Sequence, residues 1–101
     1  MPIPTVSSIQ PATGPSSGGD LLRLVGLGFA DAVRVSFGGA LAHVDSLRRE
    51  GGADIVDVRT PPHAEGAVDV VLENVDASRV AISGERVLVA GAYRFVRANV
   101  A

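Results

Sequence analysis

Short runs of alternating apolar and polar residues recur along this chain, with glycine or proline between them. Within residues 33–37, apolar side chains alternate with Arg34 and Ser36, and residues 68–73 repeat the same two-residue period. This period is typical of a strand that turns one face to a core and the other to solvent. Several such runs in a short chain predict an all-β sandwich.

The same pattern predicts the individual strands and turns. Gly38-Gly39 predicts a tight turn, and Ser83-Gly84, between apolar residues 80–82 and 87–89, predicts a separate hairpin within residues 78–91. Residues 44–50 have a weak helical pattern, but we interpret residues 48–52 as a solvated loop between strands. The remaining strands are predicted at 6–9, 20–25, 40–44, 55–58 and 93–95.

The composition is that of one domain with a hydrophobic core. The chain has 101 residues, of which 47% are hydrophobic and 4% aromatic, so aliphatic side chains must fill most of the core. The net charge of -2 argues against a nucleic-acid partner, which favours a basic surface. The absence of cysteine excludes disulfides and thiolate metal sites. No apolar stretch approaches the ~20 residues of a membrane helix.

The N-terminal segment has no basic stretch followed by an apolar run, so it predicts no signal peptide. If Met1 is the native start, we expect a cytoplasmic or particle-associated protein. No side-chain pattern predicts a catalytic, cofactor or metal site. His43 and His63 each have one carboxylate nearby, whereas a zinc site has ~3–4 ligands, so both are interpreted as surface histidines.

Four aspartates, at positions 54, 57, 69 and 76, are scattered singly and form no calcium-binding loop. We therefore interpret them as strand-face or turn residues. One tyrosine and no tryptophan argue against a carbohydrate site that stacks sugars on exposed rings, and Phe29, Phe37 and Phe95 are predicted to lie in the core. Ser16-Ser17 lacks the strand-to-helix elbow of a hydrolase nucleophile.

Several motifs follow one another in a fixed order over nearly the whole chain. They are V-S-S-I-Q-P at 6–11, G-P-x-x-G-G at 14–19, G-L-G-F at 26–29, V-S-F-G-G at 35–39, V-R-T-P-P at 58–62 and V-D-V at 68–70. Asn74, Tyr93 and Phe95 complete the series. Together these motifs resemble the IPT/TIG domain, an immunoglobulin-like fold shared by plexins, certain transcription factors and many bacterial modules.

The resemblance implies a single immunoglobulin-like β-sandwich of two antiparallel sheets over residues 1–101. The chain departs from the family pattern at Asp20, where threonine is usual, and at residues 76–77, where a glycine is expected after Asn74. The order of the closing aromatic residues is reversed, and residues 78–91 form a longer segment than usual. This long segment is the place where a surface particular to this protein is expected.

The sequence therefore predicts a non-enzymatic structural or protein-interaction module that needs no cofactor. It predicts a subunit of a larger assembly, such as a phage-like particle or another bacterial complex. The alternative is a spacer or ligand-binding domain of a longer secreted or cell-surface protein. The expected partner is a protein or a second copy of the chain, not nucleic acid, membrane or carbohydrate.

The expected partner-binding residues lie on the predicted hairpin, since an exposed strand edge recruits other strands unless it is protected. They are Arg79, Val80, Ile82, Arg86, Val87 and Val89.

Overall fold

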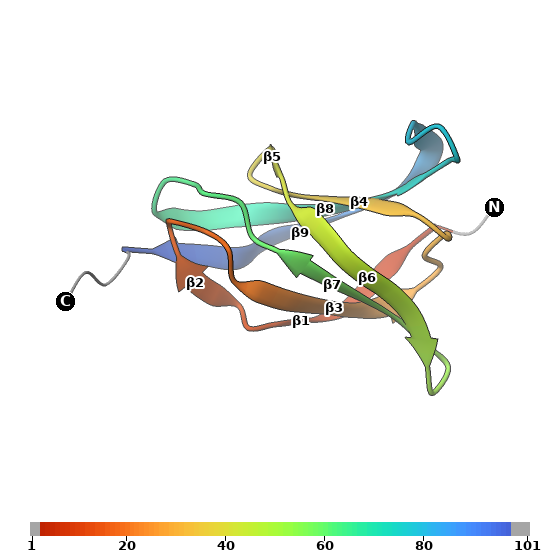
Figure 1. Cartoon of the computed structure of the whole chain (residues 1–101), viewed down its shortest axis with the longest axis horizontal. Coiled ribbons are helices and arrows are strands. Elements are labelled where there is room, and N and C mark those ends of the chain that lie inside the picture. Colours follow the sequence, from red (N-terminus) through yellow and green to blue (C-terminus); the bar gives the residue numbers. More distant parts are fainter. Residues whose placement is uncertain (1–2, 98–101) are drawn as a thin grey trace.

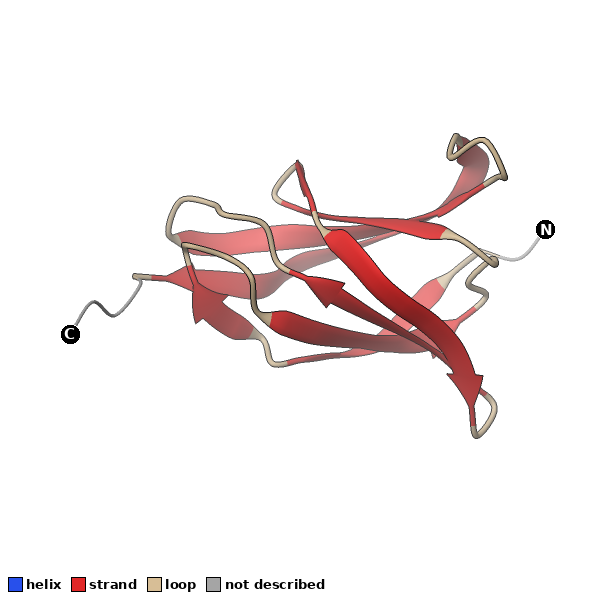
Figure 2. Cartoon of the chain, viewed as in Figure 1, coloured by secondary structure: helices blue, strands red, loops and turns tan. Residues whose placement is uncertain are grey.

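A computed structural model of the chain describes residues 3–97, in which all regular structure is β-strand (Figure 2). The strands are β1 (Thr5–Gln10), β2 (Thr13–Pro15), β3 (Leu21–Leu27), β4 (Val33–Phe37), β5 (Ala40–Leu41), β6 (His43–Glu50), β7 (Ala53–Arg59), β8 (Gly66–Val75) and β9 (Ala81–Val96).

The strands form two sheets that pack face to face (Figure 1). The first sheet has the order β1-β3-β7-β6, and the second has the order β2-β9-β8-β4-β5. Neighbouring strands are antiparallel except for β2 and β9, which run parallel. This arrangement confirms the predicted all-β sandwich.

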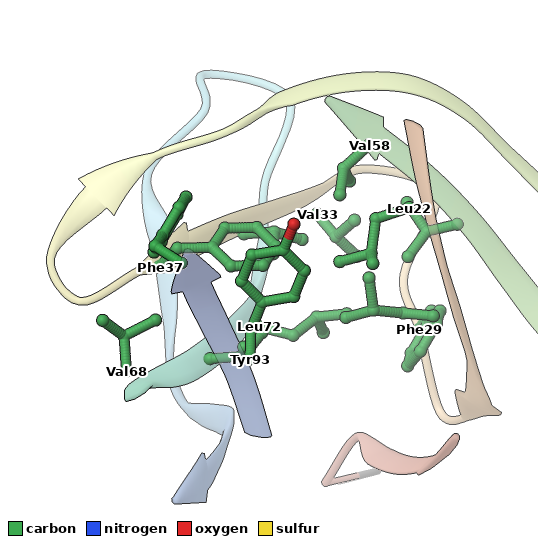
Figure 3. Close-up of a cluster of buried hydrophobic side chains, with 13 residues drawn as sticks. Leu22, Phe29, Val33, Phe37, Val58, Val68, Leu72 and Tyr93 are labelled. Atoms are coloured by element: carbon green, nitrogen blue, oxygen red, sulfur yellow. The ribbon is translucent and has the colours of Figure 1, made fainter. Parts of the chain in front are cut away.

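The core lies between the sheets and is built by the alternation seen in the sequence (Figure 3). In β4 and in residues 68–73 of β8 every second residue is apolar and buried, while the residues between them are not buried. Each buried valine or leucine contributes about 1.5–3 kcal/mol relative to an exposed one. The fully buried aliphatic residues of the core are Leu22, Leu24, Val35, Val56, Val58, Val70 and Leu72.

Aromatic side chains fill one part of this core, as predicted for Phe37 and Phe95. The Tyr93 ring meets Phe37 edge to face with centroids 5.2 Å apart, and it meets Phe95 in the same way at 5.0 Å. Edge-to-face contact is the favoured geometry of aromatic pairs. His63 stacks on the outer side of this cluster, with its ring centroid 5.0 Å from that of Phe95. Phe29 is also buried, against the remainder of the core.

The predicted solvated loop at residues 48–52 is wrong, and so is the helical pattern noted before it. β6 continues to Glu50 and pairs with β7 through Arg49↔Asp54 and Glu50↔Ala53. The chain reverses at Gly51 and Gly52, whose φ angles are 58° and 82°. Two consecutive left-handed residues match the twist of a hairpin, and glycine adopts this conformation without a steric penalty.

The predicted hairpin at Ser83-Gly84 is also wrong, because residues 81–96 form the single strand β9, which pairs with β8. The chain turns earlier, between β8 and β9, where Asp76 Oδ1 accepts hydrogen bonds from the backbone N–H groups of Ser78 and Val80 at 2.8 and 3.0 Å. Gly84 instead lies in a bulge, because the register jumps from Glu73↔Arg86 to Val75↔Ala81. The positive φ of 82° at Gly84 accommodates the extra residues.

The G-P-x-x-G-G motif at residues 14–19 begins with a strand that the sequence did not predict. β2 pairs with the end of β9 through Gly14↔Phe95 and its two neighbouring pairs. The turn itself follows Pro15, whose carbonyl accepts a hydrogen bond from Gly18 N at 3.0 Å.

Candidate functional site

The outer edge of β9 is largely unpaired. On the side away from β8, only Arg94–Val96 pair with a strand, namely β2. Bulges interrupt the pairing with β8 on either side of residues 86–89, where the register runs regularly from Arg86↔Glu73 to Val89↔Val70. Residues 86–89 therefore form a short regular strand whose outer edge is hydrogen-bonded to no other strand in the part of the chain that the structure describes, with β1 of the other sheet packed nearby.

The predicted partner-binding residues on this segment point in different directions. Arg86 is exposed and lies opposite Glu73 on the outer face of the second sheet. Val87 is half-buried and packs against the core, so it is not a free contact residue. Val89 is half-buried too, and it lines a shallow hollow with β1 residues 6–9. Leu88, which the sequence did not single out, is 52% exposed.

The other three predicted residues lie outside residues 86–89. Val80 is 59% exposed just before β9, and Ile82 is half-buried at the bulge. Arg79 is in the turn and lines a groove between β4 and β6, on a different side of the sandwich from the free edge of β9. The structure thus brings Arg86, Val87 and Val89 together and separates Arg79 from them.

Buried polar side chains hold the loop between β3 and β4 against both sheets. Asn74 of β8 is fully buried, and its Oδ1 accepts a hydrogen bond from Ala30 N at 2.9 Å. Its Nδ2 donates to Gly28 O at 2.9 Å and to Glu85 Oε1 at 3.0 Å. Glu85 is 8% exposed, and the bulge of β9 places its carboxylate inside.

Asp54 holds the same loop from the first sheet. Its Oδ2 accepts a hydrogen bond from Phe29 N at 2.9 Å, and its Oδ1 lies 3.1 Å from Arg49 Nε. Arg49 Nη2 also donates to Phe29 O at 2.6 Å. Asp54, interpreted from the sequence as a strand-face or turn residue, is a buried loop anchor. The one sequence signal for this role is the presence of Arg49 and Asp54 on either side of a Gly-Gly turn.

Two further aspartates, Asp57 and Asp69, make hydrogen bonds within the fold. Asp57, on β7, is hydrogen-bonded by Arg48, Arg23 and Ser46. Partial burial opposes ionisation of this carboxyl, but these hydrogen bonds outweigh the burial and lower its pKa below the ordinary value of 3.8. Asp69 Oδ1 accepts a hydrogen bond from Gly91 N at 2.9 Å, across the second bulge of β9.

Neither histidine belongs to a metal site in the described range. His43 is largely exposed, with its Nε2 3.5 Å from Asp45 Oδ1. Across residues 3–97, no group of three histidine, aspartate or glutamate side chains is placed to hold an ion. The same residues form no helix that could span a bilayer.

A model of the IPT/TIG domain matches residues 4–89, which is most of the chain. The chain belongs to the IPT/TIG family. Domains of this family are immunoglobulin-like modules that generally take part in protein interactions and are not enzymes. The GP..GG and G-L-G-F motifs therefore belong to the shared scaffold, as the resemblance implied.

Two solved structures of the plexin A4 full extracellular region contain a similar fold. One, with domains 1 to 8, matches with a TM-score of 0.60 and 21% identity over 92% of this chain and 8% of the plexin chain. The other, with domains 1 to 10, matches with a TM-score of 0.63 and 20% identity over 94% of this chain and 7% of the plexin chain. The IPT/TIG domain thus spans a small part of these plexin chains. No curated protein sequence matches this chain.

Proposed function

We propose that this IPT/TIG domain is a non-enzymatic interaction module whose protein partner adds a strand to the free edge of β9 at residues 86–89. The observation that carries the proposal is that no strand is hydrogen-bonded to this edge before Arg94 within the described residues, since β1, which packs nearby, pairs with β3. A partner strand would gain main-chain hydrogen bonds there. Arg86 and Leu88, which are exposed at the same segment, supply side-chain specificity.

The bulges on either side of this edge limit what can bind. A bulge bends a strand and interrupts its pairing, which is one way proteins prevent uncontrolled edge-to-edge association. Only the short regular stretch between the bulges is open to a partner, so a short strand fits better than a long one. The remaining predicted residues, Val80 and Ile82, lie beside the first bulge, where they extend the contact beyond the paired strand.

We propose that the domain is a subunit of an assembly such as a phage-like particle or another bacterial complex. The partner is then another protein of the assembly or a second copy of this chain. The plexin structures favour a second candidate, since they contain similar folds within long extracellular chains. In that case the domain serves as a spacer or ligand-binding unit of a longer secreted or surface protein.

Affinity capture from cells, combined with the mass of the purified chain in solution, tests the proposal. Successive N–H groups of a strand point to opposite edges, so proline at one of Leu88 and Val89 removes a donor of the free edge, while proline at the other breaks the pairing with β8. We expect the variant that lacks only the free-edge donor to melt cooperatively and to lose its partner. Retention of the partner by that variant, or a monomer that captures nothing, would refute strand addition at β9.

A further inference from the structure

A groove runs along the side of the sandwich opposite to the β9 edge, between β4 and β6. β6 is the last strand of its sheet, and β5 pairs only with Ser36 and Phe37 of β4. Val33 and Arg34 of β4 therefore face this side without a neighbouring strand in the described part of the chain. The groove consists of two hollows of about 380 and 440 Å³, which share Val33, Val44 and Arg79.

The first hollow combines an apolar lining with two arginines and a histidine. Arg34, His43 and Arg79 line it, and no acidic side chain does. Arg34 donates through Nε and Nη2 to a single oxygen of Glu73, at 3.3 and 3.2 Å, so its other amino group is not used in this contact. Arg79 forms no ion pair with any residue that the structure describes. The apolar lining consists of Val33, Leu41, Ala42, Val44 and Val75.

The backbone of Arg79 supports a role beyond closing the turn. Its φ of 64° is the one positive φ of a non-glycine residue among residues 3–97. Glycine would adopt this conformation at lower cost, and strained residues of this kind concentrate at functional positions. The neighbouring carboxylate of Asp76 accepts hydrogen bonds from backbone N–H groups of the turn through Oδ1 and forms no ion pair with Arg79.

The second hollow has the opposite charge. Asp31, Asp45 and Asp76 line it together with Ser46 and Leu47, and Arg79 stands where the two hollows meet. The Asp31 side chain is fully exposed, with a single contact of 3.8 Å to Arg49 Nη1. Charge along the groove therefore changes from basic to acidic, which a uniformly acidic or uniformly basic ligand would not match.

We infer that this groove binds an extended segment of another protein that carries one acidic and one basic side chain, with apolar residues between them. The carboxylate of this segment lies in the first hollow with Arg34 and Arg79, an apolar side chain fills the shared part, and the basic side chain lies at the aspartates. The free edge of β6, which is regular from Ser46 to Glu50 beyond the bulge at residues 44–46, supplies main-chain hydrogen bonds to the segment. The inference rests on the proposed protein-binding function but assigns it a second surface.

Nuclear magnetic resonance titration of the whole isotope-labelled chain tests this inference. The probe is an acetylated, amidated peptide of eight residues, the length of β6, with valines and threonines between a glutamate and an arginine. We expect saturable shifts of the Val33, Ala42 and Val44 amides with a dissociation constant below about 1 mM. Two comparison peptides, with two glutamates or two arginines, should bind at least about fivefold more weakly, and added salt should weaken binding by the mixed peptide.

Two arginines near or on β9 provide matched variants. Arg79→Gln should weaken peptide binding at least about fivefold, whereas Arg94→Gln, the same change at an exposed arginine of β9 that lines neither hollow, should leave it unchanged. Arg79→Gly, which relieves the positive φ, keeps the test valid if the glutamine variant folds poorly. Absence of saturable shifts, equal binding of the three peptides, or equal effects at positions 79 and 94 would overturn the inference. A partner that is still captured through β9 would then leave the proposed function standing.

Discussion

Replacement of Asn74 tests how the two sheets and the loop between β3 and β4 are held together. Asn74 is fully buried and makes three hydrogen bonds, to Ala30 N, Gly28 O and Glu85 Oε1. The change Asn74→Ala removes all three at once. It leaves one backbone donor, one backbone acceptor and one carboxylate without the partner that they have in the native fold.

The expected cost follows from the burial of these groups. A buried polar group left without a partner costs about 1–3 kcal/mol, and a charged group costs more. Ala30 and Gly28 are half-buried, so water reaches them in part, while Glu85 is 8% exposed. We therefore expect a loss of about 3–5 kcal/mol in the free energy of unfolding, out of about 5–15 kcal/mol for a typical domain.

Urea unfolding followed by circular dichroism measures this loss, and thermal unfolding should show a melting temperature lower by about 12 °C or more. The control is Glu73→Ala on the adjacent residue, whose exposed pair with Arg34 is worth about 1 kcal/mol or less. In Asn74→Asp the new carboxylate would lie beside Glu85, so its stability should recover as the pH falls and one of the two acids takes up a proton. An Asn74→Ala variant within about 1 kcal/mol of the native chain, or no more destabilised than Glu73→Ala, would refute this account of the loop.

Three further predictions concern other parts of the fold. Burial, together with the charge of Asp20, raises the pKa of Tyr93 above its ordinary value of 10.0, so the contribution of Tyr93 to stability should be constant up to about that pH and be lost above it. Tyr93→Phe should remove this alkaline decline, and phenolate absorbance of the single tyrosine, which should rise at a higher pH in the folded than in the unfolded chain, provides a second measurement. Because the pKa of Asp57 is lowered, Asp57→Asn should reduce the free energy of unfolding by about 1 kcal/mol at neutral pH. The difference between the variant and the native chain should shrink as the pH falls below 3.8, which unfolding measured across acid pH would show. Gly26→Ala would place a Cβ 1.8 Å from Thr5 O, so it should destabilise the fold by about 1–3 kcal/mol by displacing β1, and an unchanged melting curve would contradict this.

The alternating runs were sufficient to predict the sandwich and its core, because a period of two places every second side chain on the buried face. Turns were harder to predict. Ser83-Gly84 has the composition of a hairpin turn, but its glycine serves a bulge that takes Glu85 inside to Asn74. The actual turn contains neither glycine nor proline. The carboxylate of Asp76 stabilises it instead, and Arg79 adopts the left-handed conformation.

The candidate surfaces likewise differ in how far the sequence could predict them. Alternation in the C-terminal segment led to residues 86–89, because an edge strand is contiguous in sequence. The groove could not be predicted in this way, since its basic end combines Arg34 of β4, His43 of β6 and Arg79 of a turn. The distance between these side chains depends on the register of β4 with β8 and of β6 with β7, and on how the two sheets pack, neither of which a single sequence reveals.

The parallel pairing of β2 with β9 has a mechanical consequence. Figure 1 shows the start of β1 and the end of β9 at opposite ends of the sandwich, with β2 and the end of β9 side by side. A force that pulled Ile3 and Arg97 apart would load the hydrogen bonds between β2 and β9, including Ser16 N to Val96 O and Arg94 N to Ala12 O, along the strands. Such bonds must break together and not one after another. Placed in series with other domains, this module would transmit tension along its length without unzipping from one end.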